Sequence, residues 1–291
     1  MNSNHNIFAR SGLAALSDLE SPEWRQVFKS LENEQALFLE HESEFRSPEY
    51  TWPRDPLHNW SRVWEYPYVN HHLRCFGEGW KSATPAKVVD LGSGVTFFPF
   101  TAAKQGFDVI CTDVDPICEK DLNRAIPRVE HGPGRVSFRL SKDSHLPFED
   151  CEADVVYCIS VLEHIPDFEC TVREMARILK PEGHLLLTVD LDLRGDLELG
   201  VEQQQRLVRT LGEYFEFDSP EVTLHPADVL NSVNAPFGCK PPVGWRRARF
   251  LAKERILKRI VGRKPKPLVP FFLAVQGFAM VRRQVIRSEV R

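Results

Sequence analysis

The segment from residue 86 to residue 193 alternates between two rhythms, and this alternation restricts the fold more than any other feature of the chain. Longer stretches with apolar residues at helical spacing are FPFTAAKQG, CEKDLNRAI and FECTVREMARILKP. The short apolar runs that predict strands are VVDLG, DVICTD, RVSFRLS, ADVVYCIS and GHLLLTVDL. Strands that alternate with helices form a parallel sheet whose crossover helices cover its faces. The pattern therefore predicts an α/β fold of the doubly wound, Rossmann-like kind.

The two ends of the chain complete this picture. PFFLAVQGFAMVRR predicts a last strand and FDSPEVTLH a further one, which gives a mostly parallel sheet of seven strands. Near the N-terminus, Ser21 and Pro22 predict the start of a helix that runs to about Glu44. The prolines of TWPRDPLHNWSRVWEYPYVNHH exclude one long helix there, so we expect a lid that closes with a helix at about 67–77.

This organisation suggests two parts. Residues 1–85 form an N-terminal helical lid region, and residues 86–291 form the sheet domain, with a basic insertion at 225–267 before the last strand. No run of about 18 apolar residues occurs, and MNSNHNIFAR lacks the features of a signal peptide, so we expect a cytoplasmic protein. The seven cysteines are scattered without a C-x-x-C pair, so we expect reduced, mostly buried thiols and no metal site.

The turn after the first predicted strand indicates the ligand. A dinucleotide-binding turn needs glycines at its first, third and sixth positions. The window that starts at Gly92 has Gly94 third but Phe97 sixth. Asp90 would repel a phosphate and suit a cation, whereas Asp113, at the end of the second strand, is placed to accept hydrogen bonds from a ribose diol. A ligand with a ribose, a positive charge and no phosphate fits both acids, and S-adenosylmethionine is such a ligand.

Taken in order, these segments resemble class I S-adenosylmethionine-dependent methyltransferases over about residues 86–193. VVDLGSG resembles the family's first motif, and VICTDVDP resembles its second-strand acid. LPFEDCEADVVYCISVLEHIPD resembles the fourth-strand region, and REMARILKPEGHLLLTVDL the helix, turn and fifth strand that follow. The resemblance implies S-adenosylmethionine as cofactor, S-adenosylhomocysteine as product and methyl transfer as activity.

The resemblance also implies contacts to the methionine end and the ribose of the cofactor. Asp90, Gly92 and Gly94 would hold the methionine end, and Asp113 would hold the ribose hydroxyls. Thr96 stands where the family usually has a third glycine, and it can line the turn.

Contacts to the adenine and the sulfonium follow in the same way. Val114 would flank the adenine, and Asp143 or Ser144 would contact its amine. Asp143 lies one residue nearer to the LPF sequence than the family pattern predicts. Ser160, at the tip of the fourth strand, would lie near the sulfonium.

The lid carries a second resemblance, to a segment that precedes the first strand in some glycan and natural-product methyltransferases. In SRVWEYPYV, Arg62, Glu65 and Tyr66 would help to close the cofactor pocket, Arg62 by pairing with the methionine carboxylate. The alternative is a packed lid whose aromatic side chains only belong to the core.

Four residues are candidates for the acceptor side. His164 follows the fourth strand and could act as a base for a hydroxyl acceptor, or it could simply cap or pack in the loop. Glu163 could bind a substrate group or complete a turn. Asp190 and Asp192 leave the fifth strand at the edge where open parallel sheets bind ligands, although helix capping explains at least one of them as readily.

The charge of the chain is unevenly distributed. Residues 246–291 carry a balance of +12, which leaves −16 on the first 245 residues. As a helix, residues 246–266 would present an apolar arc interrupted by Arg249 and Lys253, which suits the surface of an anionic membrane. The alternatives are contact with nucleic acid or a phosphorylated acceptor, and a solvated face that compensates the acidic body.

We therefore expect a methyltransferase that acts on a small molecule or a sugar unit, with oxygen as the acceptor atom and nitrogen as the alternative. A nucleic-acid base is less expected, because the fourth strand ends in ISVLEHI and not in the Asn/Asp-Pro-Pro-aromatic motif of exocyclic-amine methylators. The alternative from another class is a regulatory protein that binds the cofactor without turnover.

Overall fold

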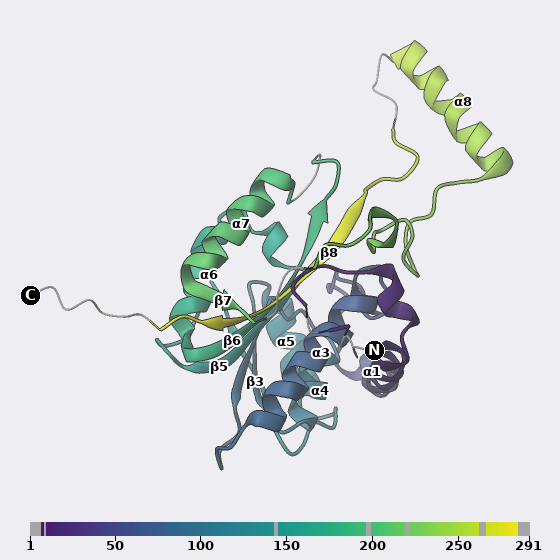
Figure 1. Ribbon diagram of the computed structural model, residues 1–291. Coiled ribbons are helices and arrows are strands. Elements are labelled where there is room, and N and C mark those ends of the chain that lie inside the picture. Colours follow the sequence, from purple (N-terminus) through teal and green to yellow (C-terminus); the bar gives the residue numbers. More distant parts are fainter. Residues whose placement is uncertain are drawn as a thin grey trace, which may run out of the picture.

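One twisted sheet with helices on both faces organises the chain (Figure 1). The computed structural model describes residues 7–8, 10–142, 145–195, 199–218, 222–261 and 266–284. In that part of the chain the sheet has eight strands, in the order β1-β8-β6-β5-β2-β3-β4 with β7 paired to β8. The predicted doubly wound α/β architecture is confirmed, with eight strands in place of the expected seven.

The centre of the sheet is parallel. β2 (Lys87–Leu91) pairs with β3 (Asp108–Asp113) on one side and with β5 (Ala153–Ile159) on the other. β3 pairs with β4 (Arg135–Leu140), and β5 pairs with β6 (Leu179–Asp192). The five predicted strands are confirmed, and β6 begins earlier than expected. The predicted turn at 180–183 lies inside this strand, where the β5–β6 register shifts and Glu182 has a positive φ of 62°.

The remaining strands are antiparallel. β8 (Leu273–Arg282) pairs with β6 and is the predicted last strand. β8 also pairs with β1 (Gly12–Leu13), which the sequence did not predict, and with β7 (Phe215–Phe217). FDSPEVTLH was predicted as a strand, but Phe217 alone of this segment lies in β7. Residues 219–221 of the segment lie outside the described part, and residues 222–225 have no regular structure.

Two apolar cores lie on opposite faces of the sheet, because successive strand residues point to opposite sides. Val88 joins one core and Val89 joins the other. The first core includes residues of α3 (Arg62–Gly79), α4 (Phe98–Lys104) and α5 (Pro116–Ala125). The second includes residues of α6 (Phe168–Ile178) and α7 (Val201–Tyr214). This burial on both faces explains why the parallel strands are continuous apolar runs in the sequence.

The leading region begins as the sequence predicts. The Ser21 Oγ atom accepts a hydrogen bond of 3.1 Å from the backbone N–H of Trp24 and caps α1 (Pro22–Glu40). A break at His41 separates α1 from α2 (Glu42–Phe45), so the predicted helix to Glu44 consists of two helices.

The start of α3 corrects the sequence prediction. The helix begins at Arg62, earlier than the expected residue 67, and Pro67 lies inside it. A proline within a helix removes one backbone hydrogen bond, and tertiary packing offsets that loss here. The Trp64 ring lies against Gly277 of β8, where an added Cβ would come within 2.7 Å of the ring. This contact fixes the first turn of α3 over the sheet.

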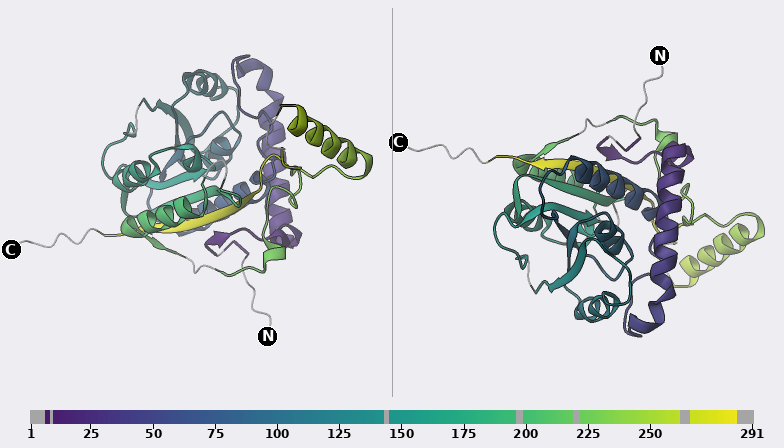
Figure 2. Two further views of the ribbon diagram at one scale, coloured as in Figure 1. Left: turned by 90° about the horizontal axis from the view of Figure 1, so that it is seen from above. Right: turned by 90° about the horizontal axis from the view of Figure 1, so that it is seen from below.

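The basic insertion contains a helix that the sequence did not place. α8 (Gly244–Val261) extends away from the sheet in Figure 1 and lies at the margin of the molecule in Figure 2. It makes no extensive contact with any other described helix or strand. Among the described residues, no helix combines the length and the apolar character that crossing a bilayer requires.

The cysteines are all free thiols. Cys111, Cys118 and Cys158 are buried, whereas Cys75 and Cys151 are exposed. Within the described ranges, no group of three or more His, Cys, Asp or Glu side chains is arranged to hold a metal ion.

Candidate active site

The glycine turn after β2 lies at the carboxyl edge of the parallel strands. Gly92 and Gly94 have positive φ angles of 73° and 54°, which favour glycine. An added Cβ at Gly92 would lie 2.5 Å from a methyl group of Val161, so glycine is also required sterically there. The Gly92 N–H donates a 2.8 Å hydrogen bond to the carbonyl oxygen of Thr112. The turn is therefore held close to β3, with Gly92 and Gly94 half-buried.

Asp90 is a buried acid at the end of β2, with 5% of its surface exposed. Burial raises its pKa to about 8; the Tyr157 hydroxyl beside it lowers the pKa in part, and the charge of Asp113 raises it. A carboxyl in such surroundings gains most from a cation that enters the site. The predicted role of Asp90 toward a cationic group fits this environment.

Asp113 ends β3 and is already held by backbone groups. Its Oδ2 atom accepts a hydrogen bond of 3.0 Å from the N–H of Gly94, and its Oδ1 atom accepts one of 3.0 Å from Asp115. These bonds fix the carboxylate at the rim of the turn. Val114 follows with 71% of its surface exposed, which suits a side chain that covers a planar ring. Asp143 and Ser144, the predicted adenine contacts, lie outside the described residues.

The first turn of α3 lies over this edge. The Arg62 Nη1 atom donates a 2.5 Å hydrogen bond to Glu65, and the second carboxylate oxygen of Glu65 accepts a 2.6 Å bond from the Ser160 hydroxyl. Glu65 has no exposed surface. Tyr66 is buried, and its ring centroid lies 5.3 Å and 4.9 Å from those of Phe97 and Phe98. Arg62, Tyr66 and Ser160 are thus brought together, with Glu65 as the link between lid and sheet.

The ends of β5 and β6 add two more acids to this edge. Glu163 accepts a 3.1 Å hydrogen bond from the backbone N–H of Asp190. The pKa of Glu163 is raised to about 8, chiefly by burial and also by the like charge of Glu65, against the lowering effect of backbone hydrogen bonds and of Arg62. Ser160 has a positive φ of 45°, which turns the chain sharply from β5 into the 3₁₀ helix η2 (Leu162–His164). The result is a group of three carboxylates, Glu65, Glu163 and Asp190, around one guanidinium.

His164 and Asp192, the other candidates for the acceptor side, do not belong to this group of carboxylates. His164 is exposed at the end of η2. Asp192 is buried, and its Oδ1 atom accepts a 2.9 Å hydrogen bond from the N–H of Arg194, so it caps the turn after β6. Of the two acids predicted at this strand exit, Asp190 belongs to the candidate site and Asp192 supports the backbone.

Two residues of the leading region contact the site without a signal in the sequence. The Tyr50 hydroxyl accepts a 3.1 Å hydrogen bond from the N–H of Val95 and lies over Gly94, where an added Cβ would be 3.2 Å away. The Arg46 guanidinium lies 4.2 Å from the Tyr50 ring centroid and donates a 3.0 Å bond to the Val95 carbonyl oxygen. Neither residue belongs to a motif, because both act through contacts with a turn more than 40 positions away in the sequence.

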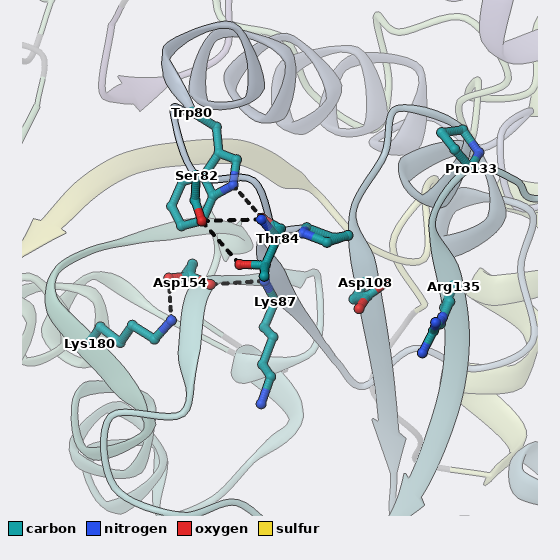
Figure 3. A pocket seen from close by; sticks show the side chains of 10 residues that line it. Trp80, Ser82, Thr84, Lys87, Asp108, Pro133, Arg135, Asp154 and Lys180 are labelled. Atoms are coloured by element: carbon teal, nitrogen blue, oxygen red, sulfur yellow. Dashed lines mark hydrogen bonds and ion pairs between the residues drawn. The ribbon is translucent and has the colours of Figure 1, made fainter.

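A hollow of about 490 Å³ lies at the opposite, amino edge of the strands (Figure 3). Trp80, Lys87, Asp108, Asp154 and Lys180 are among its lining residues. Figure 3 shows Lys180 directed at Asp154. The Lys180 Nζ atom donates a 2.6 Å hydrogen bond to Asp154, which also accepts a 2.9 Å bond from the backbone N–H of Lys87. Lys180, Asp154 and the Lys87 backbone satisfy one another, whereas the acids at the carboxyl edge face one guanidinium. The carboxyl edge is therefore the candidate site.

The carboxyl edge fits a cationic adenosine derivative on three observations. The turn leaves no Cβ at Gly92 or Gly94, Asp90 is a buried acid suited to an ammonium group, and Asp113 and Val114 stand side by side at the rim. Phe97 occupies the sixth position of the turn, where a dinucleotide-binding turn has its third glycine, and this opposes a dinucleotide.

The sequence of the parallel-sheet segment is similar to that of known proteins. Residues 89–187 match the family described as a methyltransferase domain. The chain is 36% identical over 113 residues to the methyltransferase GfsG of Streptomyces halstedii, which covers 38% of this chain and 40% of that protein. It is 32% identical over 127 residues to a ubiquinone biosynthesis O-methyltransferase of Aliivibrio fischeri, which covers 42% of this chain and 53% of that protein. The matches thus span about half of the length of these relatives or less.

Among solved structures, the [4+2]-cyclase SpnF has a similar fold over most of the chain. The TM-score is 0.51 at 16% sequence identity, and the match covers 94% of this chain and 99% of that one. At this identity the likeness concerns the fold alone, and it extends that fold to the leading region and the last strand.

Proposed function

We propose that this chain, whose residues 89–187 match the methyltransferase-domain family, is a class I S-adenosylmethionine-dependent methyltransferase that methylates a hydroxyl of a small molecule or a sugar unit. The observation that carries the proposal is the acid-lined glycine turn at the carboxyl edge, where Asp90 is buried with a raised pKa and Asp113 is fixed beside Val114. When bound, S-adenosylmethionine supplies the electrophilic methyl group.

The chain's own residues divide the task of holding this cofactor. Asp90 takes the ammonium group, and Arg62 takes the carboxylate while it keeps its contact with Glu65. Asp113 accepts hydrogen bonds from the ribose hydroxyls with its remaining lone pairs, since each backbone bond uses only one. Val114 covers the adenine. The buried first turn of α3 excludes water from the methionine end, which favours in-line displacement.

Glu163 is the proposed general base for the acceptor hydroxyl. Its carboxyl lies at the end of β5 beside Asp190, and a pKa of about 8 is suited to accept a proton near neutral pH. Asp190 orients the acceptor, and His164, exposed at the rim, is the alternative base. An amine acceptor would not need this base, so the environment of Glu163 favours oxygen. The relative from Aliivibrio fischeri, a ubiquinone biosynthesis O-methyltransferase, agrees with this choice.

The proposal also names the acceptor, the cellular compartment and the two parts of the chain. The acceptor is a small molecule or a sugar unit, reached in the cytoplasm, with residues 1–85 as the lid and 86–291 as the catalytic domain. Nucleic acid is not the acceptor in this proposal, since the end of β5 lacks the motif of base-amine methylators.

Transfer of labelled methyl from S-adenosylmethionine tests the proposal. The purified protein is incubated with a panel of phenols, catechols and sugars, and with amines of matched size. We expect label on hydroxyl compounds and lower transfer by Glu163→Gln, with His164→Gln as the matched comparison. Tight binding of S-adenosylhomocysteine with no transfer to any acceptor would favour the regulatory alternative. Thermal stabilisation by a pyridine dinucleotide in place of S-adenosylhomocysteine would contradict the site assignment itself.

A further inference from the structure

Helix α8 concentrates positive charge away from the body of the protein. The described part of the chain provides no carboxylate that pairs with any of its seven cations, and all seven are exposed. They are Arg246, Arg247, Arg249, Lys253, Arg255, Lys258 and Arg259. The acidic first 245 residues therefore do not neutralise this helix through direct contacts, which was the simplest expectation from the sequence.

One side of α8, around Glu254, is less exposed than the other. Glu254 is 6% exposed, and its Oε2 atom accepts a 2.8 Å hydrogen bond from the backbone N–H of Lys266. Phe250 and Leu257, four residues before and three residues after Glu254, are half-buried on the same side. This side of α8 is therefore less accessible to solvent than the rest of the helix.

The opposite side of α8 is uncovered and carries a different pattern. Trp245, Arg249, Ala252 and Ile256 follow one another at spacings of four, three and four residues, so they form one stripe. Trp245 is 67% exposed and Ile256 is 56% exposed. Trp245 and Ile256 are therefore exposed to solvent on the same side of the helix. Arg249 lies between them, and further cations flank them.

We propose that this stripe of α8 docks on the surface of a bilayer that contains anionic lipids. Trp245 and Ile256 enter the interface, and the long side chains of Arg249 and Lys253 extend from the helix toward the headgroups. The cations on the flanks add attraction that extends over about a Debye length. The −16 balance on residues 1–245 repels the same surface, so the molecule approaches with α8 first.

A lipid surface explains the stripe better than nucleic acid does. Phosphates of nucleic acid would account for the arginines and lysines, but they give no reason to expose Trp245 and Ile256 beside them. The docking is independent of methyl transfer and would hold even if the protein binds its cofactor without turnover.

Vesicle sedimentation with the full-length protein tests this proposal. The probes are vesicles of phosphatidylcholine alone and of phosphatidylcholine with phosphatidylglycerol, each at low and high salt. We expect sedimentation with the anionic vesicles at low salt, and its loss at high salt or with phosphatidylcholine alone. Arg249→Glu with Lys253→Glu should lower the partition coefficient by about tenfold or more. Lys81→Glu with Arg209→Glu, which changes the charge equally on exposed residues elsewhere, should leave it nearly unchanged.

Replacement of the apolar pair separates docking from general charge attraction. Trp245→Ser with Ile256→Ser keeps all the cations, and we expect about a tenfold loss of partitioning with an unchanged melting temperature, since α8 does not pack on the sheet. Undiminished sedimentation of this variant would overturn the proposal, as would an absence of wild-type binding at low salt. Binding of a fluorescent DNA duplex at lower protein concentration than anionic vesicles would also overturn it, in favour of nucleic acid.

Discussion

Replacement of Asp90 by asparagine should stabilise the free protein while it weakens the cofactor complex. The pKa of Asp90 is raised from 3.8 to about 8, so the folded state holds a proton that the unfolded state releases. The free energy of unfolding therefore falls as the pH rises from about 4 to about 8, and it is level above that range. Between about pH 5 and pH 8, at about 1.4 kcal/mol per pH unit, the wild type should lose about 4 kcal/mol relative to Asp90→Asn.

The same group makes cofactor binding dependent on pH in the opposite sense. An ammonium group pairs with the ionised carboxylate, and at pH 7 a group with a pKa of about 8 is ionised in about one molecule in ten. Binding of S-adenosylhomocysteine should therefore release close to one proton, and its affinity should rise up to tenfold per pH unit until about pH 8. Asp90→Asn should lose this dependence and bind about 10 to 100 times more weakly above pH 8, since a charge-assisted bond is lost.

Two measurements check this prediction. Urea unfolding at several pH values compares the wild type, Asp90→Asn and Asp167→Asn, whose exposed carboxyl caps α6 and serves as the matched control. Calorimetry in buffers with different ionisation enthalpies counts the protons released on binding. The reasoning is refuted if the wild-type affinity for S-adenosylhomocysteine is constant between pH 6 and pH 8 and the free energies of unfolding of the wild type and Asp90→Asn change with pH in the same way.

Three further predictions concern the same edge of the sheet. Glu163→Gln should lower kcat by about 10² to 10⁴ and remove the rise of wild-type kcat through about pH 8; an unchanged pH profile would exclude Glu163 as the base. Arg62→Ala should raise the Kd for S-adenosylhomocysteine by about tenfold or more and also lower the melting temperature, because the buried carboxylate of Glu65 loses its cation; unaltered affinity in calorimetry would remove the role of Arg62 in binding. Gly92→Ala should lower the free energy of unfolding by about 3 kcal/mol, from its positive φ and the contact with Val161. Adding Val161→Ala should restore part of that loss in urea unfolding, and no recovery would show that backbone strain alone is responsible.

The parts of the fold that the sequence predicts well are those with local causes. VVDLG and DVICTD are apolar because β2 and β3 are buried on both faces, and their ends coincide with the predicted ends to within a residue. Asp90, Gly92 and Asp113 could be assigned from their positions at strand ends, because parallel strands bring their carboxyl ends to one edge. The Ser21 cap likewise depends on a contact three residues away.

The misjudged parts depend on distant contacts. Pro67 signals a helix break by local rules, but the packing of Trp64 on Gly277 keeps α3 continuous through it. β1 has only two residues and pairs with β8 at the far end of the chain, so it is too short to show the apolar alternation that predicts a strand. The link from Glu65 to Ser160 joins residues 95 positions apart, and its partner could only be identified once the helix lay over the sheet.

These distant contacts bear on how the acceptor is chosen. Tyr50 and Glu65 both reach the carboxyl edge from the leading region, where one contacts Val95 and the other Ser160. Asp190 reaches it from beyond residue 187, where the family match ends. The matched segment therefore contains the acids and glycines that suit the cofactor, while Tyr50, Glu65 and Asp190, the proposed orienting residue of the acceptor, complete the edge from outside it. Relatives that share the acceptor of this chain should accordingly resemble it at residues 46–66 and 190–194, and likeness over 89–187 alone should accompany many different acceptors.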